Sequence, residues 1–137
     1  MGFLLSIFLL VYPYLPRTYM MKEVIIAFDI DGTILNNEGI PPETPPHLRP
    51  MHGVNIEVIL LMQLLSKNIK NSRIIVWSGG GQEYAEKICR LYGLDRYVHR
   101  AYGKQTYDET TDGKVDICFD DVHACALADK NLIVKMK

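Results

Sequence analysis

The feature that most constrains this chain is an apolar strand that runs directly into two aspartates and a glycine. Residues 24–28 read Val-Ile-Ile-Ala-Phe, and Asp29, Asp31, Gly32 and Thr33 follow. A run that is apolar at every position predicts a strand buried on both faces, as in a parallel sheet. In open α/β sheets, ligands bind beyond the carboxyl ends of the strands, which is where these carboxylates would lie. Two acids one residue apart in such a place suit a metal ion and a phosphoryl group.

Apolar runs and helical patterns alternate along the rest of the chain. This alternation predicts an α/β fold of the doubly wound (Rossmann-like) type, with a five-stranded parallel sheet, helices on both faces and right-handed crossovers. The expected strands after the first are 73–77, 97–101, 115–119 and 132–135, and the expected helices are 56–68, 82–91 and 123–128. The proline-rich stretch 36–53 and the polar stretch 104–113 are expected to be loops.

Length and composition limit the compartment and the partners. The 137 residues suit one domain, and a formal net charge of −1 gives no long-range attraction to nucleic acid or acidic membranes. No basic stripe or aromatic platform indicates a nucleic-acid groove. Cys89, Cys118 and Cys125 form no C-x-x-C pair, so we expect reduced thiols in a reducing, cytoplasmic compartment.

An apolar stretch sets residues 1–20 apart from the rest of the chain. Residues 3–15 are almost wholly apolar but too short to span a membrane, which takes about 20 apolar residues. No basic residue precedes the stretch, and no small-x-small cleavage site follows it. We interpret 1–20 as an extension that reflects a misassigned start codon, with a signal or membrane anchor as the alternative. The catalytic domain is expected to cover 21–137, with membrane contact only if the extension is real.

Further polar residues follow the other expected strands. Asp120 and Asp121 follow the fourth strand, and carboxylate oxygens are the ligands that Mg²⁺ prefers in proteins. Ser78 and Gly79 follow the second strand at the start of a helix, where a hydroxyl and backbone N–H groups can hold phosphate oxygens. A doubly wound sheet gathers these strand ends along one edge, so we expect a site there.

Two lysines are candidates for a positive charge at this edge. Lys104 follows the third expected strand, which places it at the same edge as the carboxylates. Lys114 precedes the fourth strand, so a rise of about 3.3 Å per residue should put it roughly 15 Å away, at the opposite edge. This geometry favours Lys104, with Lys114 as the alternative.

These patterns resemble the motifs of the haloacid dehalogenase superfamily. Its first motif, four apolar residues followed by Asp-x-Asp-x-Thr, is filled by residues 25–33. Ser78 matches the second motif, and Asp120-Asp121 matches the fourth in its Asp-Asp form. The third motif departs from the common layout, in which a lysine leads a helix. The resemblance spans about residues 22–135 and implies the strand order 5-4-1-2-3. Because the insertions after the first two strands are short, we expect a member with no cap domain.

The resemblance also implies the chemistry of each residue. Asp29 would be the nucleophile that takes the phosphoryl group, and Asp31 would act as general acid and then general base. The residues implied for Mg²⁺ are Asp29, Asp31 (through its backbone carbonyl), Asp120 and Asp121. The residues implied for the phosphate group are Thr33, Ser78, Gly79 and Lys104.

We therefore expect a Mg²⁺-dependent phosphomonoester hydrolase that acts through an aspartyl-phosphate intermediate on a phosphorylated substrate. Asp31 favours this activity because relatives that cleave carbon–halogen bonds lack the second acid. Two alternatives stay open: a phosphotransferase that uses the same residues, and a non-catalytic binding protein on the same fold. A site without a cap is either open to large substrates or covered by a neighbouring subunit of a homo-oligomer.

Overall fold

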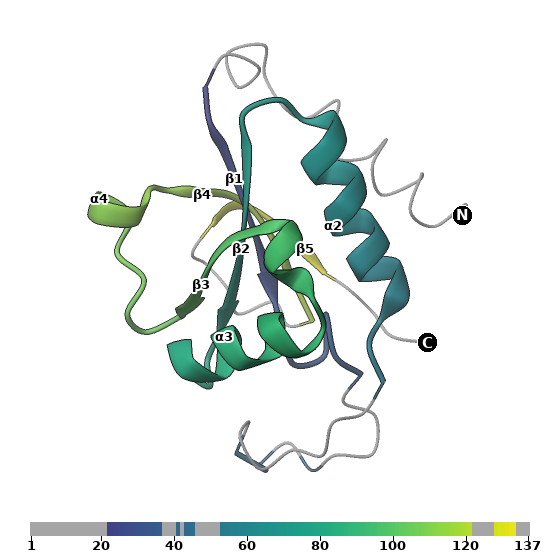
Figure 1. Cartoon of the computed structure of the whole chain (residues 1–137). Helices are drawn as coiled ribbons and strands as arrows, with labels where there is room; N and C mark the ends of the chain where they lie inside the picture. The colour runs from purple at the N-terminus through teal and green to yellow at the C-terminus, as the bar shows by residue number, and fades with distance from the viewer. Residues whose placement is uncertain (1–21, 37–40, 42, 46–52, 122–127, 134–137) are drawn as a thin grey trace.

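The computed structural model describes residues 22–36, 41, 43–45, 53–121 and 128–133 (Figure 1). The expected extension 1–20 lies outside these residues, as do residues 123–127 of the expected helix 123–128, whose last residue Ala128 belongs to strand β5. The elements in chain order are β1 (Val24–Asp29), α2 (Ile56–Asn68), β2 (Ser72–Ser78), α3 (Gln82–Leu91), a 3₁₀ turn (Leu94–Arg96), β3 (Val98–Gly103), α4 (Glu109–Asp112), β4 (Val115–Asp120) and β5 (Ala128–Ile133).

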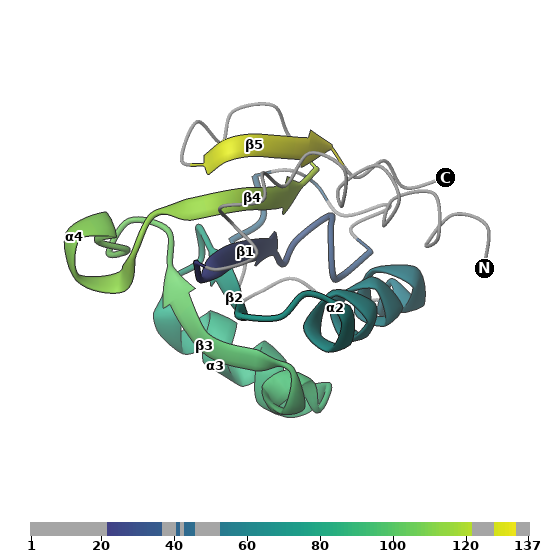
Figure 2. The same cartoon turned by 90° about the horizontal axis from the view of Figure 1, so that it is seen from above.

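The five strands form one sheet in which every neighbouring pair is parallel. Their order is β3-β2-β1-β4-β5, which is the predicted order 5-4-1-2-3 counted from the other edge. Figure 2 shows the strands side by side, from β5 at the top to β3 at the bottom. The predicted fold class is thus confirmed, and the described residues contain no cap domain.

The central strand β1 is buried along its whole length, as its unbroken apolar run predicts. Side chains alternate between the two faces of a strand, so β1 contributes to both halves of the core. Val24, Ile26 and Phe28 join a large cluster that includes the buried residues of α2 and α3. Ile25 and Ala27 join a smaller cluster on the other face.

Three aromatic rings, which we call the aromatic group, lie together in and against the smaller cluster. Tyr107, from the connection between β3 and β4, meets Trp77 and Tyr102 edge-on, with ring centroids 5.4 and 4.9 Å apart. Its hydroxyl donates to the carbonyl of Gly113 at 2.6 Å. These contacts pin the connection to the sheet, while α4 within it lies far from α2 in both views (Figures 1 and 2).

The structure departs from the sequence expectation in at least three places, the first being the expected strand 97–101, which is Val98–Gly103 in the structure. The predicted strand 132–135 begins four residues earlier, at Ala128, and ends at Ile133. Its first half was missed because β5 is an edge strand, where exposed residues such as Lys130 and Asn131 carry no apolar signal. The predicted loop 104–113 contains α4, one turn of helix that Asp108 caps by accepting from the Thr110 N–H at 2.9 Å.

None of the helices in the described part of the chain is long and apolar enough to cross a bilayer.

The packing of α2 predicts a contrast between two adjacent leucines. Leu61 is fully buried and Leu60 is 40% exposed. We expect Leu61→Ala to lower the free energy of unfolding by about 2–5 kcal/mol, since it leaves a cavity beneath the sheet. Leu60→Ala should cost about 1 kcal/mol or less. Urea denaturation of both variants measures the difference, and equal losses would contradict the observed helix face.

Candidate functional site

Four strands of the sheet end in, or lead directly to, polar residues at one edge. Asp29, Ser78 and Asp120 are the last residues of β1, β2 and β4. Lys104 directly follows β3, and its backbone N–H donates to the carbonyl of Ser78 at 2.9 Å. Parallel strands of similar length bring their carboxyl ends together, so residues far apart in the chain meet here.

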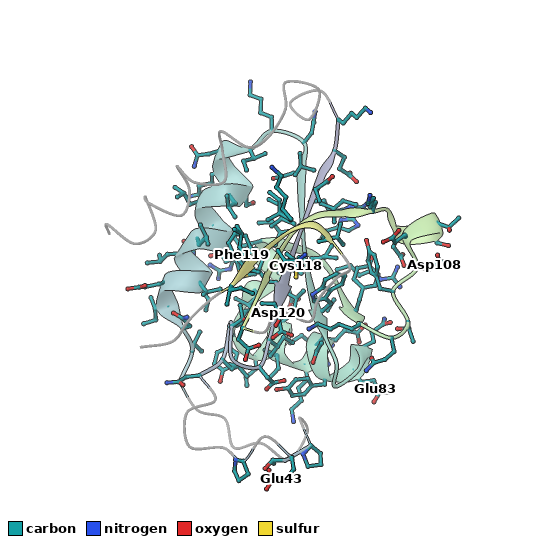
Figure 3. The ribbon with its side chains drawn as sticks, turned by 180° about the vertical axis from the view of Figure 1, so that it is seen from behind. Glu43, Glu83, Asp108, Cys118, Phe119 and Asp120 are labelled. Atoms are coloured by element: carbon teal, nitrogen blue, oxygen red, sulfur yellow. The ribbon has the colours of Figure 1, made fainter. Side chains whose placement is uncertain are left out.

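The centre of this edge is an ammonium group between two buried carboxylates. The Nζ of Lys104 lies 2.9 Å from Oδ1 of Asp29 and 2.8 Å from Oδ2 of Asp120. Asp29 is 5% exposed and Asp120 is 1% exposed. In Figure 3, Asp120 lies near the middle of the molecule beside Cys118 and Phe119, whereas Asp108 lies at its margin. The sequence candidate Lys104 is therefore in the cluster, and Lys114 lies exposed at the opposite end of β4.

A third carboxylate completes an acidic group. One oxygen from each of Asp29, Asp120 and Asp121 lies within 4.8 Å of the others. The group therefore combines three carboxylates with one ammonium. All the donors are carboxylate oxygens, the set that suits a hard divalent cation such as Mg²⁺. The acidic group therefore fits the metal that the sequence implied.

The burial and the crowding of charge perturb the titration of this group. Burial, together with the neighbouring carboxylate of Asp120, raises the pKa of Asp29 to about 7, although the Lys104 ammonium opposes the shift. Burial and the adjacent Asp120 raise the pKa of Asp121 to about 6. Burial lowers the pKa of Lys104, but Asp29 and Asp120 outweigh it, so the net direction is upward.

The pKa values of Lys104 and Asp29 are thus both raised, but this favours the charged form of Lys104 and the neutral form of Asp29. Lys104 faces two acids and is the more exposed partner, so its charged form is favoured. Asp29 faces one cation and two other acids while almost fully buried, so its charged form is disfavoured. An added cation would reverse that balance for Asp29.

Gly32 allows the turn after β1 to approach the acidic group. Its φ is +84°, and a Cβ at this position would collide with the carboxylate of Asp121. The turn is closed by the Gly32 N–H, which donates to the carbonyl of Leu35 at 2.9 Å. Only a residue without a side chain combines this backbone conformation with this approach.

Asp31 lies on the same turn, but its carboxylate is not part of the acidic group. Its Oδ1 accepts a hydrogen bond of 2.8 Å from the hydroxyl of Tyr84, which belongs to α3. Asp31 is half-buried. The structure therefore separates the two aspartates of the first motif: Asp29 joins Lys104, and the Asp31 carboxylate points to α3.

The glycine-rich loop joins β2 to α3 beside the acidic group. The Oγ of Ser78 accepts from the Gly80 N–H at 3.0 Å, and Ser78 is buried. The side-chain amide of Gln105 donates to the carbonyl of Gly79 at 2.7 Å. Thr33 is fully buried, and its Oγ1 has no hydrogen-bond partner among the described residues.

Sequence reasoning missed Tyr84 and Gln105. A tyrosine in the first turn of a helix is ordinary, and nothing in its spacing points back to a turn 53 residues earlier. Gln105 follows Lys104 in a stretch with no apolar pattern, so no periodicity predicted which way its side chain points. Both contacts depend on which strands are neighbours, and that information lies in the fold.

Comparisons with known proteins place this chain by its fold. No family model matches it, and no curated protein matches it. A chain in the solved "Structure of Pnkp1/Rnl/Hen1 complex" is similar, with a TM-score of 0.54 and 17% sequence identity. The likeness covers 83% of this chain and 46% of that one, so this chain spans about half the length of its structural neighbour. At this identity the likeness concerns the fold alone.

The raised pKa of Asp29 predicts a pH-dependent cost in stability. The native state holds the Asp29 proton up to about pH 7, whereas the unfolded chain releases it near its ordinary value of 3.8. Stability in EDTA should therefore fall as the pH rises between these values. Asp29→Asn removes this ionisation and leaves Lys104 paired with Asp120. We expect its thermal midpoint in EDTA at pH 8 to exceed that of the wild type by about 4 °C, the shift that about 1 kcal/mol produces.

The difference in midpoint should shrink toward pH 4 and reverse when Mg²⁺ stabilises only the wild type. Asp108→Asn is the matched control, because hydrogen bonds from Thr110 and Thr111 lower the pKa of this exposed carboxyl. That variant should show no gain at pH 8. A midpoint for Asp29→Asn below the wild type in EDTA at every pH would contradict the assigned burial cost.

Proposed function

We propose that this protein is a Mg²⁺-dependent phosphomonoester hydrolase of the haloacid dehalogenase-like class, acting through an aspartyl-phosphate intermediate. The observation that carries the proposal is the Lys104 ammonium between buried Asp29 and Asp120, with the third carboxylate of Asp121 beside them. A purely structural domain gains nothing from gathering three acids at one sheet edge, because their mutual repulsion and burial destabilise it. A phosphoryl-transfer site needs both a cation and carboxylates at one point.

Asp29 is the nucleophile in this proposal. Its carboxylate oxygen attacks the phosphorus, the bond from phosphorus to the ester oxygen breaks, and the electron pair leaves with that oxygen. Asp31 supplies the proton that the leaving oxygen takes up. In the second step Asp31 receives a proton from water, the water oxygen attacks the phosphorus, and the bond to Asp29 breaks. Phosphate is released, and both carboxyl groups return to their starting states.

The remaining residues hold the phosphate group and its charge. Lys104 offers its ammonium to phosphate oxygens while it remains against Asp29 and Asp120. Ser78 and the N–H groups at the start of α3 provide neutral donors for the same oxygens. Asp29, Asp120 and Asp121 would hold Mg²⁺, together with the Asp31 carbonyl, and bound Mg²⁺ would offset the negative charge of substrate and carboxylates.

The first test is phosphate release from a panel of phosphomonoesters, with Mg²⁺ and with EDTA. The wild type should release phosphate only with Mg²⁺, and Asp29→Asn should lose activity by several orders of magnitude, as expected for a covalent nucleophile. Asp108→Asn, at the margin of the molecule, should retain wild-type turnover (Figure 3). Wild-type-like turnover by Asp29→Asn would exclude the nucleophile assigned here.

The two candidate lysines give a second test. Lys104→Ala should sharply lower kcat and weaken competition by inorganic phosphate, since it removes the one ammonium that contacts the acidic group among the described residues. Lys114→Ala changes an exposed residue about 20 Å along β4 from Asp120, so activity should stay unchanged. Circular dichroism of both variants checks that they fold. Loss of activity in Lys114→Ala but not in Lys104→Ala would exclude the assigned charge role.

A further inference from the structure

The general acid of the proposed reaction has a contact that the mechanism above does not use. The hydroxyl of Tyr84 donates to Oδ1 of Asp31 at 2.8 Å. The carboxylate of Asp31 is separate from the acidic group that would hold the metal. A carboxyl that must deliver a proton to one oxygen needs a fixed direction, and a hydrogen bond to one of its oxygens supplies one.

Tyr84 is itself fixed by the packing of α3. It is the third residue of that helix, and its ring packs partly buried against the large apolar cluster. Ala85, Ile88 and Cys89 bury the same helix against the sheet. The helix begins directly after the glycine-rich loop. The hydroxyl therefore presents Asp31 with a donor whose position is set by the core.

We propose that Tyr84 is a positioning residue, which orients the carboxyl of Asp31 for proton transfer to the leaving oxygen. The inference rests on the proposed phosphatase function. In the first step the ester bond breaks, the leaving oxygen keeps the electron pair, and the proton of Asp31 moves to it. Tyr84 keeps its own proton and strengthens its hydrogen bond as Asp31 becomes charged. In the second step Asp31 takes a proton from the attacking water, with Tyr84 still donating.

The packing of the Tyr84 ring does not by itself require a hydroxyl group at this position. Tyr92, at the other end of α3, packs partly buried against the same apolar cluster. A phenylalanine would fill the space of either ring. What Tyr84 adds is one donor atom, aimed at a carboxylate 53 residues away in the chain. A misplaced catalytic group costs rate even when the fold is intact.

The test compares leaving groups, because a general acid matters most when the leaving oxygen is basic. The variants are Tyr84→Phe, Asp31→Asn, the double variant and the matched control Tyr92→Phe. The substrates are 4-nitrophenyl phosphate, whose leaving oxygen needs little help, and phenyl phosphate, whose leaving oxygen needs more. Values of kcat/KM with Mg²⁺ are compared, since they report the step that breaks the ester bond.

We expect Tyr84→Phe to lose about tenfold more activity on phenyl phosphate than on 4-nitrophenyl phosphate, which is less than the roughly hundredfold cost of a catalytic group misplaced by 1 Å. Asp31→Asn should show a larger loss with the same dependence on leaving group, and Tyr84→Phe should add no further loss in that background. Tyr92→Phe should resemble the wild type on both substrates.

Two kinds of result would overturn the inference. Equal loss on both substrates, or a full additional loss in the Asp31→Asn background, would show that Tyr84 acts apart from Asp31. A wild-type protein that releases phosphate, with Asp31→Asn dependent on leaving group and Tyr84→Phe unchanged, would remove the role of Tyr84 alone. A wild-type protein that releases phosphate from neither substrate would remove the proposed function, and this inference with it.

Discussion

The Lys104 ammonium lies between two buried carboxylates, and the rest of the site is arranged around that contact. It ties the ends of β1 and β4 to the residue after β3. Without a cation between them, two ionised carboxylates at this depth would repel each other strongly. Asp121 adds a third carboxylate to the group. The fold therefore places three carboxylates and one ammonium at one edge of the sheet, and the carboxylate oxygens are a donor set that suits a further cation.

The pairing of two central strands places that cluster directly above the apolar core. Phe28 and Phe119 are partners in the register of β1 and β4, and their rings stack with centroids 4.6 Å apart. Asp29 directly follows Phe28 on β1, and Asp120 directly follows Phe119 on β4. The parallel backbone pairing of β1 and β4 thus holds the two acids side by side. The residues before the two acids belong to the large apolar cluster, which stabilises β1 and β4. The unfavourable burial of charge is therefore confined to the last residue of each strand.

Much of this arrangement could be predicted from the sequence. The run 24–28 identified the central strand, and the polar residues after four strands identified the edge where Asp29, Ser78, Lys104 and Asp120 meet. The helix predicted over 82–91 has those bounds in the structure. The start of β5 could not be predicted, because an edge strand is stabilised by its backbone pairing with β4 rather than by an apolar run. The direction of the Asp31 side chain could not either, since it depends on Tyr84 from a helix brought close only by the fold.

The aromatic group on the other face of the sheet gives the protein an optical property. Trp77 is the single tryptophan of the chain, it is fully buried, and it is the register partner of Asp29. It also directly precedes Ser78, and Tyr107 meets its ring edge-on. All tryptophan fluorescence of the protein therefore originates from one point beneath the candidate site. The emission follows the environment of the sheet where β1 and β2 end, so the native chain carries its own spectroscopic reporter for that edge.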